Sequence, residues 1–481
     1  MHALLISTYE LGRQPFGLAS PTAWLRHAGW DVTCIDLAKQ RLPDDLAATA
    51  SLIGFHLPMH TATRLAGPVI DRVRRLAPAA RICAYGLYAP LNGGWLRSIG
   101  VDDVLGGEFE EDLTAIAAAL ASTDQVADEN RGRPPVPTAA TKKGDGSLSV
   151  GTPAVPRLHF LVPDRTGLLP LDRYATLQMP DGSRRVVGST EASRGCKHLC
   201  RHCPIVPVYE GQFRIVPVEV VLADVAAQVA RGAAHITFGD PDFFNGPAHA
   251  MRIVDGLHAA HPEVSYDVTI KIEHVLKHRD LLPRLRDTGC LFVTSAVESV
   301  DDRALTHLRK GHTRLDFIEA ATLSRSIGLT LVPTFVAFHP WLTLAGYCDL
   351  LETIAALELV DHVPSIQLAI RLLIPAGSKL LEIEEIRGLV AGFDPATLAY
   401  GWAHPDSRVD DLQKEIAALV GVRIASDRRA LFEEISALAY DRAGIARRTA
   451  DMPGAAQRVV PYLSEPWYCC AEPNPDDMRI I

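Results

Sequence analysis

The sequence has no excess of positive charge, because 48 Lys and Arg stand against 57 Asp and Glu, a net charge of −9. No basic field would hold polyphosphate non-specifically, which excludes a general nucleic-acid coat protein. The 35 Gly and 33 Pro are too few and too dispersed for a collagen-like or low-complexity chain. A run of about 18 apolar residues and a signal peptide are both absent. We therefore expect a cytoplasmic protein with no nucleic-acid partner and no membrane partner.

Cysteine is also scarce, with nine among 481 residues. In a reducing cytosol, thiols that cluster indicate metal or redox chemistry rather than disulfides. Two groups do cluster, and they are Cys196, Cys200 and Cys203, and the adjacent pair Cys469 and Cys470. The other four are interpreted as small core residues, namely Cys34, Cys83, Cys290 and Cys348.

The length and the hydrophobic content of 48% predict several domains with sizeable cores. Apolar runs alternate with helical periods in a first βα series and again in a second one, separated by a segment rich in Pro, Gly, Ser and Thr. We expect a doubly wound parallel sheet first and then six βα units of a partial barrel. The predicted divisions are a first domain at 1–121, a flexible linker at 122–156, the partial barrel at 157–400, and a helical extension with the tail at 401–481.

The predicted strands follow the apolar runs of each series. In the first domain they are Ala3–Ser7, Trp30–Ile35, Ser51–Phe55, Arg81–Tyr85 and Val101–Leu105. In the barrel they are Val186–Thr190, His235–Phe238, Ser265–Ile270, Leu291–Ala296, Leu329–Ala337 and Ser365–Leu373.

The triad of Cys196, Cys200 and Cys203 directly follows the first predicted barrel strand. One short loop can present three thiolates to three irons of a 4Fe-4S cluster and leave the fourth iron open for an exchangeable ligand. A structural zinc site is the alternative, with His198, His202 or a distant thiol as the fourth ligand. Because zinc sites are usually assembled from two separated ligand pairs, the spacing favours the cluster.

The spacing Cys-x3-Cys-x2-Cys on such a loop resembles the radical S-adenosylmethionine (SAM) superfamily. The resemblance implies that SAM chelates the open iron and that an electron from the cluster breaks a carbon–sulfur bond of SAM, releasing a carbon radical. It also implies an electron donor such as flavodoxin or ferredoxin. Members usually have an aromatic residue before the third cysteine, near the adenine, and His202 takes that position here.

Further positions of the barrel agree with this resemblance. Gly239 and Asp240 end the second predicted strand, where the family places a motif that contacts the SAM amino group. Glu298 follows the fourth strand, where the family hydrogen-bonds the ribose or reaches the methionyl group, at the edge where barrel enzymes build their sites. The segment Arg309-Lys310-Gly311 also resembles an element of the family, which implies that a cation there could pair with the SAM carboxylate. Surface charge at a helix end is the favoured interpretation of Arg309 and Lys310.

The first domain resembles the flavodoxin-like, cobalamin-binding domain that many of these relatives carry. The likeness rests on Pro15–Ala19, on Gly54 and Phe55, and on the segment 106–110, whose small residues would let backbone approach a ligand. No Asp-x-His-x-x-Gly occurs, so no histidine ligand to cobalt is expected. Two alternatives stay open: cobalamin held without a protein ligand to cobalt, and a domain that has lost the cofactor, which is slightly favoured.

The tail Trp467-Tyr468-Cys469-Cys470-Ala471-Glu472-Pro473 resembles radical SAM proteins named for a terminal Cys-Cys-Ala-Glu-Pro, some with selenocysteine at the second position. This resemblance implies that Cys470 takes part in chemistry. A similar pair occurs in a radical SAM enzyme of arsinothricin biosynthesis, and paired thiolates suit a thiophilic element. We expect Cys469 and Cys470 to be catalytic, holding a soft substrate or resolving an intermediate.

The predicted function is that of a radical SAM enzyme that cleaves SAM and modifies or alkylates a small molecule, with a thiophilic centre on the tail thiols as one form of it. A cobalamin-dependent radical SAM methyltransferase is the enzymatic alternative. An alternative of another class is a non-catalytic metal-binding or redox-sensing module. The predicted fold is α/β, a flavodoxin-like (Rossmann-like) domain followed by a partial (βα)6 radical SAM barrel and a helical extension.

Overall fold

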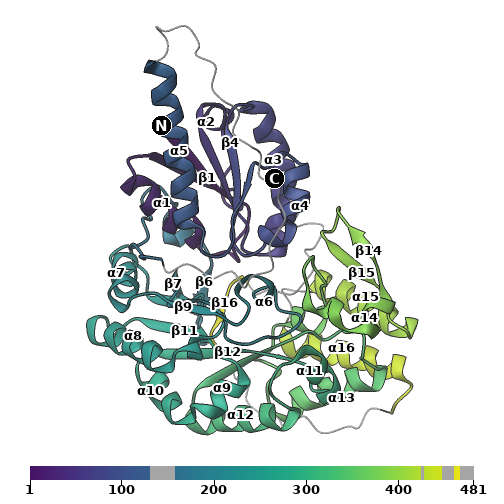
Figure 1. The fold of residues 1–481 in the computed structure, drawn as a ribbon. Coiled ribbons are helices and arrows are strands. Elements are labelled where there is room, and N and C mark those ends of the chain that lie inside the picture. The colour runs from purple at the N-terminus through teal and green to yellow at the C-terminus, as the bar shows by residue number, and fades with distance from the viewer. Residues whose placement is uncertain (130–157, 424–426, 447–459, 466–481) are drawn as a thin grey trace.

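The computed structural model describes residues 1–129, 158–423, 427–446 and 460–465, which form two α/β units stacked on each other (Figure 1). Most of the expected linker, 122–156, lies outside the described residues, but the helix before it continues to Glu129. Within the described residues, no helix is long and apolar enough to cross a membrane.

The first unit is a five-stranded parallel sheet with the order β2-β1-β3-β4-β5, the flavodoxin-like order, as predicted. Leu4 and Ile6 face one helical layer, whereas Ala3 and Leu5 face the other, so both faces of the sheet are buried. The strands are β1 (His2–Ser7), β2 (Asp31–Asp36), β3 (Leu52–His56), β4 (Arg81–Tyr85) and β5 (Asp103–Val104). The helices are α1 (Phe16–His27), α2 (Asp44–Thr49), α3 (His60–Leu76), α4 (Gly93–Ser98) and α5 (Glu110–Glu129).

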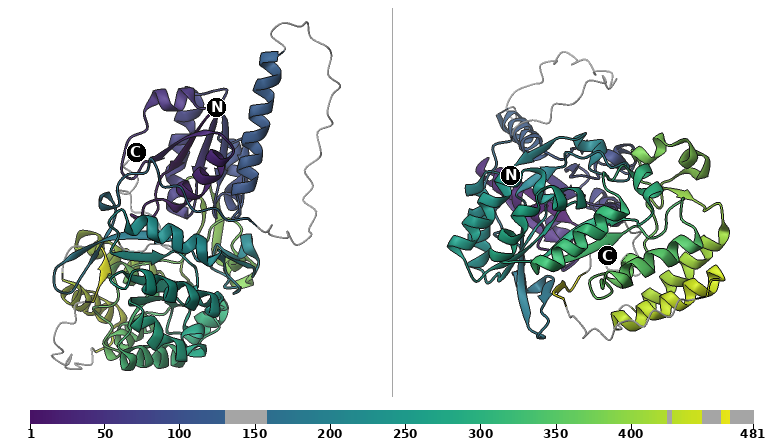
Figure 2. Two further views of the ribbon diagram at one scale, coloured as in Figure 1. Left: turned by 90° about the vertical axis from the view of Figure 1, so that its left-hand side faces the viewer. Right: turned by 90° about the horizontal axis from the view of Figure 1, so that it is seen from below.

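The second unit is an open, curled sheet with five consecutive parallel strands (Figure 2). They are β7 (Arg184–Thr190), β10 (His235–Phe238), β11 (Ser265–Thr269), β12 (Cys290–Glu298) and β13 (Thr330–Phe335). The covering helices are α7 (Val218–Val229), α8 (Pro247–Ala260), α9 (Ile272–Lys277), α10 (Leu282–Asp287), α11 (Asp302–Leu308), α12 (Arg314–Ile327) and α13 (Leu344–Ala356). Two short strands, β8 (Ser193–Gly195) and β9 (Phe213–Ile215), flank the loop after β7 together with α6 (Val206–Tyr209).

The sixth barrel position differs from the predicted strand Ser365–Leu373. Residues Ser365–Leu368 form a 3-10 helix, and the extended chain after it makes a single parallel bridge, Phe338 to Arg371. At the other edge, β6 (Thr176–Gln178) and β16 (Tyr462–Leu463) add two antiparallel strands. The chain near residue 460 therefore returns to the start of the barrel.

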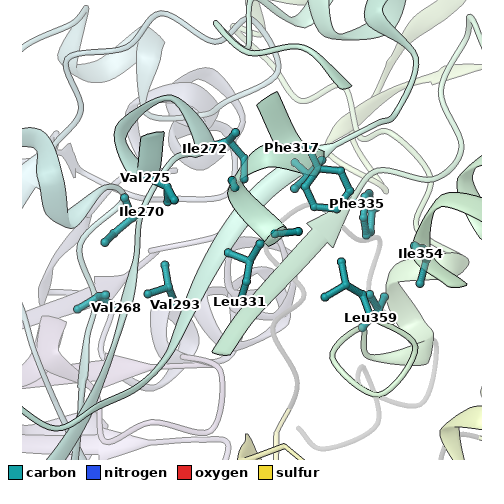
Figure 3. Packing of buried hydrophobic residues seen from close by; sticks show 14 of the residues in the cluster. Val268, Ile270, Ile272, Val275, Val293, Phe317, Leu331, Phe335, Ile354 and Leu359 are labelled. Atoms are coloured by element: carbon teal, nitrogen blue, oxygen red, sulfur yellow. The ribbon is translucent and has the colours of Figure 1, made fainter. Parts of the chain in front are cut away.

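The core of the barrel fills the space between the sheet and its outer helices (Figure 3). Val268, Val293 and Leu331 come from three neighbouring strands, and Val275 and Phe317 face them from α9 and α12. All five are at most 2% exposed. This packing fixes the strand ends, where the loops of the site begin.

The C-terminal region is mainly helical, as expected. It contains α14 (Glu384–Leu389), α15 (Ser407–Arg423) and α16 (Arg428–Ala443), and α16 packs against α13. A hairpin of β14 (Val390–Asp394) and β15 (Ala399–Trp402) was not predicted and crosses the expected boundary at residue 400. It contacts the first unit, because His60 Nε2 lies 2.7 Å from the Thr397 carbonyl oxygen.

Candidate active site

The three clustered cysteines lie on the loop between β8 and α6. Cys196 and Cys200 are buried and Cys203 is half-buried, and no disulfide joins cysteines of the described residues. Gly195 turns the chain into this loop with φ of 75°, and a Cβ there would collide with the Tyr209 ring and the Gln212 carbonyl oxygen. The strand, the turn and the loop together bring the three cysteines to the lining of one cavity.

The spread of these thiols separates the two metal hypotheses. Zinc–sulfur bonds of about 2.3 Å in a tetrahedral site hold the sulfur atoms within about 3.8 Å of one another. In the described part of the chain, the three sulfur atoms of the triad do not all lie within 4.8 Å of one another. Thiolates on three different irons of a cubane lie farther apart, so the geometry favours the cluster.

Asp240 anchors the strand that leads into the cysteine loop. One carboxylate oxygen accepts a hydrogen bond from the Ala192 N–H at 2.9 Å, and the other accepts one from the Ser193 hydroxyl. Burial raises the pKa of Asp240 to about 7, against the lowering effect of these donors. Asp240 and Gly239 also line the cavity described below, so the acid serves the loop and faces the ligand space.

His202, Glu298 and Lys310 form a buried ionic cluster beside the cysteine loop. His202 Nε2 lies 3.0 Å from Glu298 Oε1, and Lys310 Nζ donates to the same oxygen at 3.3 Å. Although burial raises the pKa of Glu298, Lys310 and His202 lower it to about 2, so the carboxylate is ionised. The backbone of Glu298 has φ of 71°, a strained value for a residue with a side chain.

The surface interpretation of Lys310 is wrong. Lys310 is 3% exposed, whereas its neighbour Arg309 is exposed. The helix α11 ends at Leu308 and Arg309 takes a left-handed conformation, which turns Lys310 inward toward Glu298. The sequence contains the cation, but only the turn places it inside.

A cavity of about 400 Å³ joins the cysteine loop to the first unit. The barrel contributes the three cysteines, His202, Gly239, Asp240, Glu298 and Lys310, so all the predicted cluster and SAM residues meet here. The first unit contributes the carboxyl edge of its sheet, through Phe16, Gly17, His56, Gly86 and Phe109. One space therefore reaches both domains.

Two glycines of the first unit also leave room for side chains of the protein. A Cβ at Gly17 would collide with the His56 ring, and one at Gly107 with the Tyr209 hydroxyl. Both glycines also line the cavity. His56 is the last residue of β3, and its Nδ1 lies 3.2 Å from Glu10 Oε2.

Arg194 links the cysteine loop to the first unit, a role that the sequence did not reveal. Its guanidinium lies between carboxylates of the barrel and of the first unit, with Glu191 Oε2 at 2.8 Å and Glu110 Oε1 at 2.7 Å. The acidic run at 108–112 thus provides a partner for a buried cation. The one feature of the sequence that could have indicated this role is the position of Arg194, two residues before Cys196.

The predicted catalytic residues Cys469 and Cys470 lie outside the described residues. The described chain just before them passes the site: Leu463 in β16 lines the cavity. The side chain of Glu465 reaches Gly12 of the first unit.

Comparison with known proteins agrees with this geometry. Residues 190–352 match the radical SAM superfamily. Hopanoid C-3 methylase of Methylococcus capsulatus is 24% identical over 153 residues, 32% of this chain and 29% of that protein. A tRNA-2-methylthio-N(6)-dimethylallyladenosine synthase of Haemophilus influenzae is 26% identical over 132 residues, 26% of this chain and 28% of that protein. The aligned part thus spans less than a third of these curated relatives.

Solved structures match over more of the chain. The cobalamin-dependent SAM radical enzyme OxsB, with aqua-cobalamin and SAM bound, superposes with a TM-score of 0.66 at 14% identity, covering 92% of this chain and 72% of OxsB. The radical SAM methyltransferase TsrM from Kitasatospora setae, with cobalamin and a 4Fe-4S cluster bound, gives 0.54 at 18% identity, covering 74% and 70%. These likenesses establish the fold.

Residues 190–352 of the second unit therefore match the radical SAM superfamily, and this match supports an enzyme that cleaves SAM. Its two-domain fold is the one found in cobalamin-dependent members of that superfamily. A 4Fe-4S cluster and SAM are the cofactors of this superfamily. The match therefore disfavours the alternative of a non-catalytic metal-binding or redox-sensing module.

Proposed function

We propose that this enzyme cleaves SAM at the cysteine loop and works together with a corrinoid held at the sheet edge of the first unit, transferring a carbon group to a small molecule. The observation that carries the proposal is the single cavity that reaches both places. A first unit that had lost its cofactor would have no need to share a cavity with the cluster loop. This observation now favours retention of the corrinoid over the loss that the sequence favoured.

The cysteine loop fits a 4Fe-4S cluster. Burial raises the pKa of the Cys196 thiol to about 11, so without metal this sulfur carries a proton, which binding to iron displaces. Cys196, Cys200 and Cys203 would hold three irons. The cluster supplies the electron that breaks a carbon–sulfur bond of SAM, and a flavodoxin or ferredoxin would reduce it.

The barrel residues fit SAM through their charges and positions. Glu298, held ionised by Lys310, offers a fixed acceptor for the ribose hydroxyls. Asp240 and Gly239 at the second strand face the amino group, and the His202 imidazole lies beside the third cysteine, where the adenine would stack. Each group is held by its own contacts before the ligand arrives, which lowers the cost of binding.

The first unit fits a large apolar cofactor at the carboxyl edge of its sheet. Phe16, Phe109, Met59 and His56 line the cavity there. Open α/β sheets bind ligands at this edge. We assign no cobalt ligand to His56, because its ring already contacts Tyr85, Phe109 and Glu10.

Anaerobic reconstitution with and without hydroxocobalamin tests the proposal. We expect about one corrinoid per chain, and S-adenosylhomocysteine among the products once a reductant and a substrate are present. A variant with all three loop cysteines changed to serine should lose the cluster absorption yet keep the corrinoid. No retained corrinoid, or methylthioadenosine as the SAM product, would contradict the proposal.

The tail thiols are a second candidate, favoured by the position of β16. Leu463 lines the cavity, and Cys469 follows it by six residues. At about 3.3–3.6 Å per residue, six residues span at most about 20 Å, so both thiols are within reach of the cavity. In this form of the function, Cys469 and Cys470 would hold a soft, thiophilic substrate during alkylation.

A further inference from the structure

We propose that His198, Asp242 and His274 form a mononuclear site for a divalent transition metal, zinc or iron, separate from the cluster. Each side chain offers one ligand atom, and these atoms all lie within 4.8 Å of one another. His198 comes from the cysteine loop, Asp242 from the loop after β10, and His274 from α9. None of the three lines the interdomain cavity.

The strongest support is a set of buried polar atoms without hydrogen bonds. Asp242 Oδ2 lies 2.6 Å from His274 Nδ1 and 3.3 Å from His198 Nε2. Nevertheless, all three atoms are buried, and within the described residues none of them has a partner at an angle suited to a hydrogen bond. Asp242 is 0% and His274 1% exposed, so solvent does not satisfy these two side chains. Buried polar atoms of this kind call for an explanation, and a metal ion bound by all three atoms supplies one.

The surroundings hold the ligands as metal sites usually do. The other oxygen of Asp242 accepts a hydrogen bond from the Phe244 N–H at 3.2 Å, which fixes the carboxylate and leaves Oδ2 for the metal. The other nitrogen of His198, Nδ1, lies 3.6 Å from the Glu273 carboxylate. A carboxylate behind a ligating imidazole sets its tautomer and orientation.

The ligand set defines the class of metal. Two imidazoles and one carboxylate suit zinc or iron(II), whereas calcium and magnesium prefer oxygen ligands throughout. His198 stands between Cys196 and Cys200, so a metal here would tie the cluster loop to α9 and to the end of β10. We assign the metal a positioning role, because its ligands face away from the cavity.

Metal analysis of the full-length protein, purified anaerobically from zinc-supplemented cells, tests this site. We expect about one zinc per chain beside the cluster iron, with a zinc X-ray absorption spectrum showing nitrogen and oxygen ligands at about 2.0–2.1 Å and imidazole scattering. The proposal would be overturned by a protein with no zinc and no iron beyond that of the 4Fe-4S cluster. It would also be overturned by a zinc sulfur shell at about 2.3 Å, which would assign the metal to thiols.

Variants locate the metal within the chain. Asp242→Asn keeps the oxygen that accepts from Phe244 and replaces only the ligand oxygen, and His274→Gln removes one imidazole. Both should lower the zinc content at least tenfold. His278→Gln is the matched control. The His278 and His274 ring centroids lie 5.6 Å apart, but His278 is not one of the three proposed ligands. Full zinc content in Asp242→Asn and His274→Gln would overturn the site.

The result stands apart from the proposed catalytic function. Cluster iron and corrinoid are measured in the same samples, and either can be present with or without the zinc. If a variant fails to fold, the zinc X-ray absorption spectrum of the unaltered protein still tests the proposed ligands.

Discussion

Arg194 of the cysteine loop donates hydrogen bonds to both carboxylate oxygens of Glu110 in the first unit, at 2.7 and 3.0 Å. The two side chains are 7% and 1% exposed. The guanidinium also lies 5.2 to 5.8 Å from the ring centres of Phe16, Phe109 and Phe160. Because the cation sits two residues before Cys196, the position of the cluster loop depends directly on the first unit.

Replacing Arg194 with Met should destabilise the protein strongly. The change leaves Glu110 buried and Glu191 half-buried without their cation, and removing one partner of a buried ion pair costs about 3–5 kcal/mol. The temperature of thermal unfolding and the iron content should both be lower than in the unaltered protein. Arg284→Gln is the control, since its bond to Asp255 is exposed and such pairs contribute about 1 kcal/mol or less. Equal stability of the two variants would show that Arg194 does not hold the units together.

Lys310→Gln should impair SAM binding and leave the cluster in place. Without the ammonium group, Glu298 loses the partner that holds its pKa low, and an ionised acceptor for SAM is no longer assured. We expect at least a tenfold weaker SAM affinity, measured by equilibrium binding to the reconstituted enzyme. The neighbouring exposed residue provides the control, and Arg309→Gln should bind SAM normally. If Lys310→Gln bound SAM with unchanged affinity, the proposed contact between Glu298 and SAM would be refuted.

The regular elements could be predicted from the sequence because their patterns are local. The strand His235–Phe238 was predicted with the bounds it has, and the five strands of the first sheet are in the expected places. Such strands are buried on both faces, so they read as short apolar runs between turns. The cysteine loop was found for the same reason, since its three ligands lie within eight residues.

The remaining features depend on contacts between distant segments. The partners in the Arg194–Glu110 pair are 84 residues apart, and nothing in either local sequence indicates the other. The strand β16 pairs with β6 although the whole barrel lies between them in the sequence, and two residues are too few to show a periodic pattern. The inward turn of Lys310 depends on one left-handed residue, Arg309. Tertiary structure decides all three.

Glu108→Gln should make the protein more stable at alkaline pH. Burial raises the pKa of Glu108 from 4.5 to about 7, although Arg194 opposes the shift. Because the folded pKa lies above the unfolded value, the native protein loses stability as the pH rises from about 4.5 through 7, and the glutamine variant does not. The difference should reach up to about 3 kcal/mol at pH 8 and vanish at pH 4.

Urea unfolding across this pH range measures the effect of Glu108. Glu111→Gln, at an exposed position in the first turn of α5, should follow the unaltered protein at every pH. A difference between Glu108→Gln and the unaltered protein that stays constant with pH would show that the Glu108 carboxyl does not titrate in this range.

Changing Cys469 and Cys470 together to serine should abolish turnover and leave the cluster intact. Cys469 comes six residues after Leu463, which lines the cavity, whereas the cluster ligands are on a separate loop. Serine has nearly the same size but is a poor ligand for a soft element, so the loss would report chemistry rather than packing. Product formation and iron content are measured on the same samples, and Cys348→Ser, at a buried cysteine of α13, controls for the loss of any thiol. Full activity in the double variant would exclude the tail thiols from the reaction and leave the corrinoid-assisted transfer as the remaining function of the cavity.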